Sequence, residues 1–237
     1  MPGILFYPLS ERALTIEFGK EISFKTHEQI MQADLLVRKM NFRGVIETVP
    51  ANNTLTVYYD PLLILEHNAQ GVSSAFEIMK SFLSDLIQQP SANMPLDFPL
   101  IQIPVCYSPQ LGQDLDFVSK HSHLSKEEII QLHTTSLYTV FMIGFSPGFP
   151  YLGILPEKLE VPRKSNPDSN LPAGSVAIAG RQTGIYPFET PGGWQVIGRT
   201  PLRLFDTGRS ENSLLKTGYR VQFVSITPSQ FEQFQQP

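Results

Sequence analysis

The stretch Pro90-Ser-Ala-Asn-Met-Pro-Leu-Asp-Phe-Pro99 separates two differently patterned regions of this chain. Proline lacks a backbone N–H and disfavours helical conformation in the residue before it, so three prolines in this stretch predict an extended linker. We therefore expect an N-terminal domain over residues 1–89, a linker over 90–99 and a second domain over 100–237.

The region before the linker is patterned as a small α+β sandwich. Residues 12–18 and 54–59 alternate apolar and polar side chains, which is typical of half-buried strands. Thr26 and Gln29 have the spacing of a capping box and precede a helix, and Ser73 or Ser74 is available to cap a second one. The order β-β-α-β-β-α predicts two helices on one face of an antiparallel sheet.

The region after the linker is patterned as a β-barrel or sandwich. A strand over 100–107 precedes two helices, the second of which has a capping-box spacing at Ser125 and Glu128. Beyond Tyr138, short apolar stretches are separated by glycine and proline, as in folds built from many short strands. A last helix is expected to start at Thr227-Pro228. The predicted fold class is α+β.

Composition excludes several classes of function. The 237 residues carry a formal net charge of −4 without a basic run, which disfavours binding to nucleic acid. The single cysteine, Cys106, excludes an internal disulfide framework and a zinc site made of several thiolates. No apolar run approaches the ~20 residues of a membrane span. We expect a cytoplasmic protein that binds neither nucleic acid nor membrane.

Two motifs suggest catalysis, but their physical requirements are not met. Gly144-Phe-Ser-Pro-Gly148 fits the nucleophile-elbow pattern, yet Pro147 lacks the N–H that such an elbow contributes to its oxyanion hole. Residues 193–200 nearly fit a P-loop, with Arg199 in place of lysine, but they are patterned as a strand. Arg199 could still bind a phosphate or carboxylate in a pocket of another shape.

The remaining reactive side chains have ordinary structural interpretations as well. His121 and His123 lie in a polar stretch without a third metal ligand nearby, so we expect no metal site. His133 lies on a partly apolar helix face, where both a structural and a functional role are open. Cys106 lies within a strand pattern and is most simply a buried small side chain.

The strongest functional signal is the segment from Gly144 to Pro201. Long connections rich in glycine, proline, aromatic and polar residues are costly for a barrel unless they shape a pocket or an interface. Elaborate barrel turns remain the alternative explanation.

This segment carries a resemblance to a known family. The sequence resembles the family of 5-oxoprolinase B subunits, also called allophanate hydrolase subunit 1 or KipI-like, over nearly the whole chain. The motifs that carry the resemblance are Gly144-Phe-Ser-Pro-Gly-Phe-Pro-Tyr-Leu-Gly153, Pro172-Ala-Gly-Ser-Val-Ala-Ile-Ala-Gly180, Gln182-Thr-Gly-Ile-Tyr-Pro187 and Pro191-Gly-Gly-Trp-Gln-Val-Ile-Gly-Arg-Thr-Pro201.

The resemblance implies a fold, partners and a reaction. The fold would be a small N-terminal α+β domain and a C-terminal cyclophilin-like β-barrel. The chain would act with subunits A and C in an ATP-dependent 5-oxoprolinase that opens 5-oxo-L-proline to L-glutamate. ATP, with magnesium, would occupy a site shared with a partner, and the chain alone would be inactive.

We carry that reaction onto residues of this chain as a hypothesis. Arg181 and Arg199 would contact phosphate or the substrate carboxylate, together with Gln182, and His133 or Glu189 would handle protons or magnesium. The pocket wall would be formed by Phe149, Tyr186 and Trp194.

The same resemblance implies an alternative without chemistry. KipI-like members inhibit a sensor histidine kinase by binding it, and a groove lined by Phe149, Tyr151 and Trp194 could bind a peptide or helix. Biotin-dependent carboxyl transfer is weaker, because nothing in the sequence supplies a biotinyl domain.

Overall fold

The computed structural model describes residues 4–66, 73–88 and 96–234. The chain divides into two compact units, Met1–Asp97 and Phe98–Pro237, each with its own hydrophobic core. Residues 90–95 of the expected linker lie outside the described residues.

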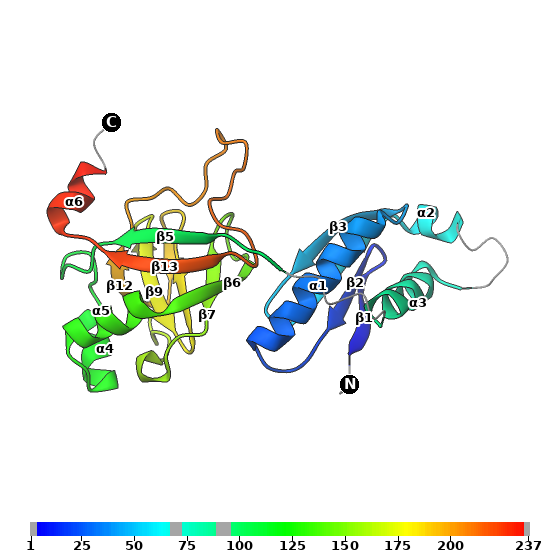
Figure 1. Cartoon of the computed structure of the whole chain (residues 1–237). Helices are drawn as coiled ribbons and strands as arrows, with labels where there is room; N and C mark the ends of the chain where they lie inside the picture. Colours follow the sequence, from blue (N-terminus) through cyan, green and yellow to red (C-terminus); the bar gives the residue numbers. More distant parts are fainter. Residues whose placement is uncertain (1–3, 67–72, 89–95, 235–237) are drawn as a thin grey trace. The chain divides into compact units, whose positions relative to one another are not determined.

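The first unit is an antiparallel four-stranded sheet with helices on one face (Figure 1). The strand order is β1-β2-β4-β3, so both edges of the sheet are formed by the first strand of a hairpin. Side chains of alternating residues in the two central strands, such as Leu14, Ile16, Leu55 and Val57, are fully buried against the helices. The strands are β1 (Leu5–Ser10), β2 (Ala13–Glu17), β3 (Val45–Pro50) and β4 (Thr54–Tyr59).

The helices of this unit are α1 (Phe24–Met40), α2 (Pro61–Glu66) and α3 (Ala75–Ile87). The expected cap of the first helix is wrong by one turn. Ser23 is the N-cap, and its Oγ accepts a hydrogen bond from the Thr26 N–H at 3.1 Å, so Thr26 lies inside the helix. The cap of α3 is Ser74, whose Oγ accepts from the Glu77 N–H, as the sequence predicts.

The second unit is built on a seven-stranded sheet in the order β12-β9-β10-β7-β6-β13-β5 (Figure 1). All its neighbouring strands are antiparallel except β13 and β5, which run parallel. A separate two-stranded sheet pairs β8 (Asp168–Leu171) with β11 (Thr190–Gly192). The seven strands are β5 (Leu100–Val105), β6 (Leu137–Ile143), β7 (Pro150–Gly153), β9 (Ser175–Ala179), β10 (Gln182–Ile185), β12 (Gln195–Arg199) and β13 (Arg220–Ser225).

This sheet curls into a half-barrel whose two edge strands meet at one point. Cys106 directly follows β5 and forms an antiparallel bridge with Arg199, the last residue of β12. The Cys106 N–H donates to the Arg199 carbonyl at 2.9 Å, and the Arg199 N–H donates to the Cys106 carbonyl at 3.0 Å. The fold is thus mixed α and β, and the cyclophilin-like character implied by the resemblance stays a prediction.

The outer edge of β12 is covered by the segment that follows Cys106. The Asp114 N–H donates to the Val196 carbonyl, and the Asp114 carboxylate accepts from the Val196 N–H at 2.7 Å. Close approach of the two segments requires glycine, because a Cβ at Gly112 would lie 2.3 Å from the Ile197 carbonyl oxygen and one at Gly198 2.9 Å from that of Cys106.

Helices α4 (Leu115–Ser122) and α5 (Lys126–Thr135) add Leu115, Val118 and Ile129 to the main core of the second unit. The capping box at Ser125 and Glu128 is confirmed. So is the helix start at Thr227-Pro228, where α6 (Pro228–Gln233) begins. Within the described residues, no helix is long and apolar enough to cross a membrane.

The closure of the half-barrel predicts a specific sensitivity at Gly112. We expect Gly112→Ala to destabilise the second unit by about 1–3 kcal/mol, because the added methyl group would overlap a backbone carbonyl. Urea unfolding followed by tryptophan fluorescence would measure this, since Trp194 is the single tryptophan of the chain.

Gly193→Ala is the matched control for this experiment. A Cβ at Gly193 would meet its nearest atom at an ordinary 3.5 Å, and neither glycine has a positive φ. Equal stability of the two variants would show that the approach of residue 112 to β12 is not tight in solution.

Candidate functional site

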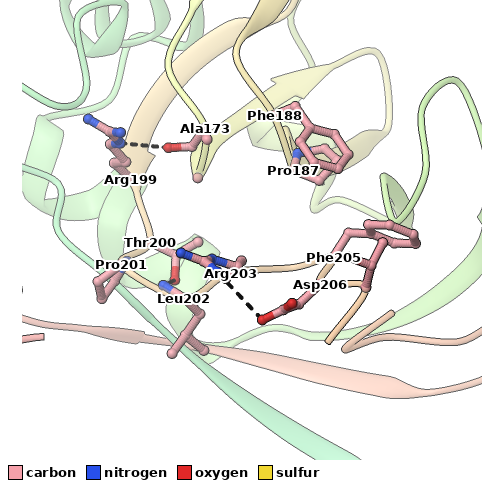
Figure 2. A pocket seen from close by; sticks show the side chains of 12 residues that line it. Ala173, Pro187, Phe188, Arg199, Thr200, Pro201, Leu202, Arg203, Phe205 and Asp206 are labelled. Atoms are coloured by element: carbon pink, nitrogen blue, oxygen red, sulfur yellow. Dashed lines mark hydrogen bonds and ion pairs between the residues drawn. The ribbon is translucent and has the colours of Figure 1, made fainter. Parts of the chain in front are cut away.

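A cavity of about 550 Å³ lies where β12 leaves the half-barrel (Figure 2). Arg199 and Thr200 at the end of β12 form one side, and Pro187 and Phe188 after β10 form another. The loop that follows β12 completes the lining with Pro201, Leu202, Arg203, Phe205, Asp206 and Thr207. Asp206 lies 3.6 Å from Arg203, so the charge of Arg199 is the one left to attract a small organic anion into this partly apolar lining.

Arg199 is half-buried in this cavity and is held by its backbone and its side chain. Its Nε donates to the Ala173 carbonyl at 2.7 Å (Figure 2). Within the described residues, no carboxylate lies within ion-pair distance of Arg199, and neither terminal nitrogen makes a hydrogen bond. Burial lowers the pKa of its guanidinium, while the charge of Glu189 raises it. The guanidinium edge is therefore available to an anion.

The walls around Arg199 are tied together by backbone hydrogen bonds. Gly174 lies in the left-handed region at φ +86°, and a Cβ there would lie 2.3 Å from the Thr200 carbonyl oxygen. Its N–H donates to the Tyr186 carbonyl at 2.7 Å, and its carbonyl accepts from the Thr200 N–H at 2.9 Å. These bonds fix the turn that carries Ala173 against the end of β12.

Glu189 lies near Arg199 but forms no ion pair with it. Its Oε1 accepts a hydrogen bond from the Asn170 side chain at 2.8 Å, and it lies on the exposed surface just before β11. The charge of Glu189 acts on the Arg199 guanidinium without a direct contact between the two side chains.

The expected aromatic wall forms a cluster of its own. Phe149 contacts both Tyr186 and Trp194 in edge-to-face geometry, with ring centroids 5.1 and 5.7 Å apart. Tyr151 joins the cluster at 4.8 Å from Phe149 and 5.8 Å from Trp194. Phe149, Tyr186 and Trp194 are all buried, and they cover the opposite face of the sheet from the main core.

The cation beside this aromatic cluster is Arg163, which the sequence motifs do not single out as a site residue. Its guanidinium carbon lies 5.9 Å from the centre of the Trp194 ring. Residues 163 and 194 are distant in sequence and follow no periodic pattern, so only the fold shows that they meet. Arg163 also lines a second cavity, of about 480 Å³, with Asp114, Phe117, Pro162, Lys164, Ser165, Asn166 and Gln195.

Arg181 and Gln182 do not join Arg199. Arg199 pairs with Ser175 at the start of β9, whereas Arg181 lies in the turn beyond Ala179 at its other end. The length of β9 separates the two positions, which amounts to about 13 Å at ~3.3 Å per residue. The two arginines therefore extend from opposite ends of β9, and the expectation that they contact phosphate or the substrate carboxylate stays a prediction.

His133 lies inside the core of the second unit, away from both cavities. Its side chain is fully buried, and its ring nitrogens lie 2.8 Å from the Tyr107 hydroxyl and 3.0 Å from the Thr183 hydroxyl. Burial lowers the pKa of His133 to about 3. His133 thus has a structural role, in which it joins α5, to which it belongs, to β10. The structure does not bring it near Glu189 or Arg199.

The other sequence motifs have structural roles. Gly144–Phe149 is a loop rather than a turn into a helix, which agrees with Pro147 inside it and Pro150 directly after it. The P-loop-like stretch is β12 itself, which confirms that it is a strand. Cys106 is buried beside the sheet closure. Within the described residues, no group of three or more His, Cys, Asp or Glu side chains could hold a metal ion.

Comparison with known proteins identifies the family. The family model described as carboxyltransferase domain, subdomain C and D, matches residues 4–215. The chain belongs to this family. It is 41% identical to the 5-oxoprolinase B subunit of Bacillus subtilis over 96% of this chain and 95% of the relative. The corresponding protein of Escherichia coli O157:H7 is 38% identical over 92% and 94%.

Solved structures agree with this assignment. The protein TTHA0988 is 32% identical with a TM-score of 0.76, and the match covers 91% of this chain and 40% of that one. The urea carboxylase of Kluyveromyces lactis has a TM-score of 0.70 at 16% identity, covering 97% of this chain and 22% of that one, and shows the fold alone. Family members thus occur both as separate chains and as parts of longer ones.

The buried His133 predicts a pH-dependent stability. In the unfolded chain His133 has an ordinary pKa of 6.5, whereas in the folded chain the pKa is about 3. Below pH 6.5 the unfolded state therefore binds a proton that the folded state does not, and stability falls by up to about 1.4 kcal/mol per pH unit. We expect His133→Gln to be less stable than wild type at pH 7.5, with the difference narrowing toward pH 5.

Urea unfolding followed by Trp194 fluorescence measures this difference in the second unit. His27, in the first unit, also has a pKa lowered by burial, to about 4, and its effect cancels when the variant is compared with wild type. A stability difference that stays constant between pH 7.5 and 5 would show that His133 titrates alike in the folded and unfolded states.

Proposed function

We propose that this chain is the B component of an ATP-dependent 5-oxoprolinase that acts together with subunits A and C. The observation that supports this most is the 38–41% identity to relatives named as the B subunit of 5-oxoprolinase, over more than nine-tenths of both chains. The reaction converts 5-oxo-L-proline, ATP and two molecules of water to L-glutamate, ADP and phosphate.

The chemistry of the substrate explains the need for ATP and for cationic side chains. The carbonyl carbon of a five-membered lactam is a weak electrophile, because the ring nitrogen donates electron density to it. Transfer of the ATP γ-phosphoryl group to the carbonyl oxygen makes this carbon more electrophilic, so that water attacks it and the ring C–N bond breaks. The resulting acyl phosphate is hydrolysed by a second water molecule, which releases phosphate and L-glutamate. Such transfer depends on positive charge at the phosphoryl oxygens.

Arg199 is the side chain of this unit best suited to contact a phosphoryl group. Its terminal nitrogens face no carboxylate within ion-pair range in the described structure, and its cavity of about 550 Å³ accommodates a small anionic group. Glu189 supplies a nearby carboxylate that could orient a proton or a nucleotide-bound magnesium ion. A magnesium ion would take its other ligands from phosphate, water and the partner subunits.

The shared-site proposal also accounts for the expected inactivity of the chain alone. β12 is not a P-loop, and the described residues gather no carboxylate cluster around Arg199. A complete site for phosphoryl transfer therefore needs groups from another subunit, and the cavity at Arg199 would contribute one part of it.

Reconstitution tests the proposed role. We expect a mixture of this chain with its A and C partners to release ADP only when 5-oxo-L-proline is present, and omission of this chain to abolish the release. Absence of 5-oxoproline-dependent ADP release from partners shown to co-purify with the chain would contradict the proposal.

A substitution tests the part assigned to Arg199. Arg199→Gln removes the charge that would contact phosphoryl oxygens, so we expect turnover of the reconstituted enzyme to fall at least tenfold, equivalent to about 1.4 kcal/mol. Arg220→Gln, which removes an exposed charge from β13, is the matched control and should retain full turnover. Full turnover in Arg199→Gln would remove Arg199 from the mechanism.

A further inference from the structure

Arg163 presents a positive charge that has no countercharge in direct contact. Within the described residues, no carboxylate lies within ion-pair distance of its guanidinium, whose central carbon lies 5.9 Å from the centre of the Trp194 ring. Its neighbour Lys164 contrasts with it, because the Lys164 ammonium lies 2.5 Å from Asp114 and 2.6 Å from Asp168. Lys164 is therefore neutralised by two ion pairs within the fold, whereas the charge of Arg163 is available to a ligand.

The backbone around Arg163 is fixed on both sides. The Pro162 carbonyl accepts a hydrogen bond from the Gln195 side chain at 3.0 Å. The Lys164 N–H donates to the Gly193 carbonyl at 2.7 Å, and the Lys164 side chain is anchored by Asp114 and Asp168. Arg163 is thus an exposed cation on an anchored segment, an arrangement that reduces the entropy lost when a ligand binds.

The charge of Arg163 acts on two tyrosines of the aromatic cluster, Tyr151 and Tyr186. Burial raises the pKa of both Tyr151 and Tyr186, and the positive charge of Arg163 opposes that effect at each of them. Both phenols are therefore neutral near pH 7. Tyr186 is buried, whereas Tyr151 is half-buried and can donate a hydrogen bond to an anion. Its ring lies 5.8 Å from that of Trp194, so Tyr151 offers an apolar face as well.

The local charge favours a ligand with a single negative charge. Lys164 and its two carboxylate partners sum to one negative charge, which Arg163 balances. A monoanionic carboxylate therefore suits this site better than a doubly charged phosphate, and the planar guanidinium matches a carboxylate through two parallel hydrogen bonds. Trp194 is buried beneath these groups, so the half-buried ring of Tyr151 supplies the apolar face for a small, flat ring beside that carboxylate.

We propose that Arg163 and Tyr151, whose side chains both lie against the buried ring of Trp194, form a binding site for a small ring carboxylate. Under the proposed function, on which this choice of ligand rests, the ring carboxylate is 5-oxo-L-proline. The site replaces Arg181 as the anchor of the substrate carboxylate, because Arg181 lies in a turn at the end of β9 and Arg163 lies at the aromatic wall.

Trp194 provides a direct readout of binding, because it is the single tryptophan of the chain and its ring lies against both Arg163 and Tyr151. We expect titration of the full chain with 5-oxo-L-proline to give a saturable change in tryptophan fluorescence. The apparent Kd should rise at least tenfold in Arg163→Gln and about threefold in Tyr151→Phe. Arg220→Gln, which replaces an exposed arginine on β13, should bind as wild type does.

Two further probes define the ligand class. 2-Pyrrolidinone has the ring without the carboxylate, and inorganic phosphate has negative charge without the ring, so each should bind at least tenfold more weakly than 5-oxo-L-proline. The absence of a saturable change in the wild-type chain would overturn the proposal. So would an unchanged Kd in Arg163→Gln, or phosphate binding as tight as that of 5-oxo-L-proline.

A parallel assay separates this proposal from the proposed function. If the reconstituted complex releases ADP in response to 5-oxoproline and Arg163→Gln leaves the KM for 5-oxoproline unchanged, the enzyme role stands and the Arg163 site is wrong. If the complex shows no such release while Trp194 fluorescence reports Arg163-dependent binding of 5-oxo-L-proline, the site stands and the enzyme role is wrong.

Discussion

The pairing of Cys106 with Arg199 is the constraint on which the second unit depends. It joins the two edge strands of a seven-stranded sheet through two backbone hydrogen bonds and so turns an open sheet into a curled half-barrel. Unpaired edge strands expose backbone donors and acceptors, and this bridge, with Asp114 at Val196, covers the edge of β12. The same backbone that closes the sheet carries the guanidinium proposed to contact a phosphoryl group.

One arginine lies at each end of β12. Arg199 belongs to the strand itself, whereas Arg163 comes from another segment and packs on Trp194. Arg199 at the C-terminal end faces a cavity and is fixed by the Ala173 carbonyl. Trp194, just before the N-terminal end, carries Arg163 over its ring. At ~3.3 Å per residue, β12 separates these ends by about 13 Å, so they contact different groups of a ligand or different ligands. In the assembled enzyme that we propose, the second unit would hold Arg163 and Arg199 at fixed positions relative to each other.

The sequence predicts local features of the fold better than the contacts between distant segments. Capping at Ser74, Ser125 and Thr227 depends on residues three apart, so it is readable from the sequence, whereas Ser23 shows that several hydroxyls can compete for one helix start. Arg163 and Trp194 meet only because the sheet curls, and no motif encodes that contact. The motifs of Arg181 and Arg199 are neighbours in sequence, which suggests a shared site, yet the β9–β10 hairpin sends the two arginines to opposite ends.

Hydrogen exchange at the Cys106 and Arg199 amides reports directly on the closure of the sheet, because both amides donate across it. We predict that they exchange as slowly as amides within β9, the sheet neighbour of β12, since opening the bridge would require the half-barrel to open. Exchange as fast as that of amides in the exposed loop after β12 would show an open sheet in solution. That result would contradict the claim that the bridge between Cys106 and Arg199 holds Arg199 in place.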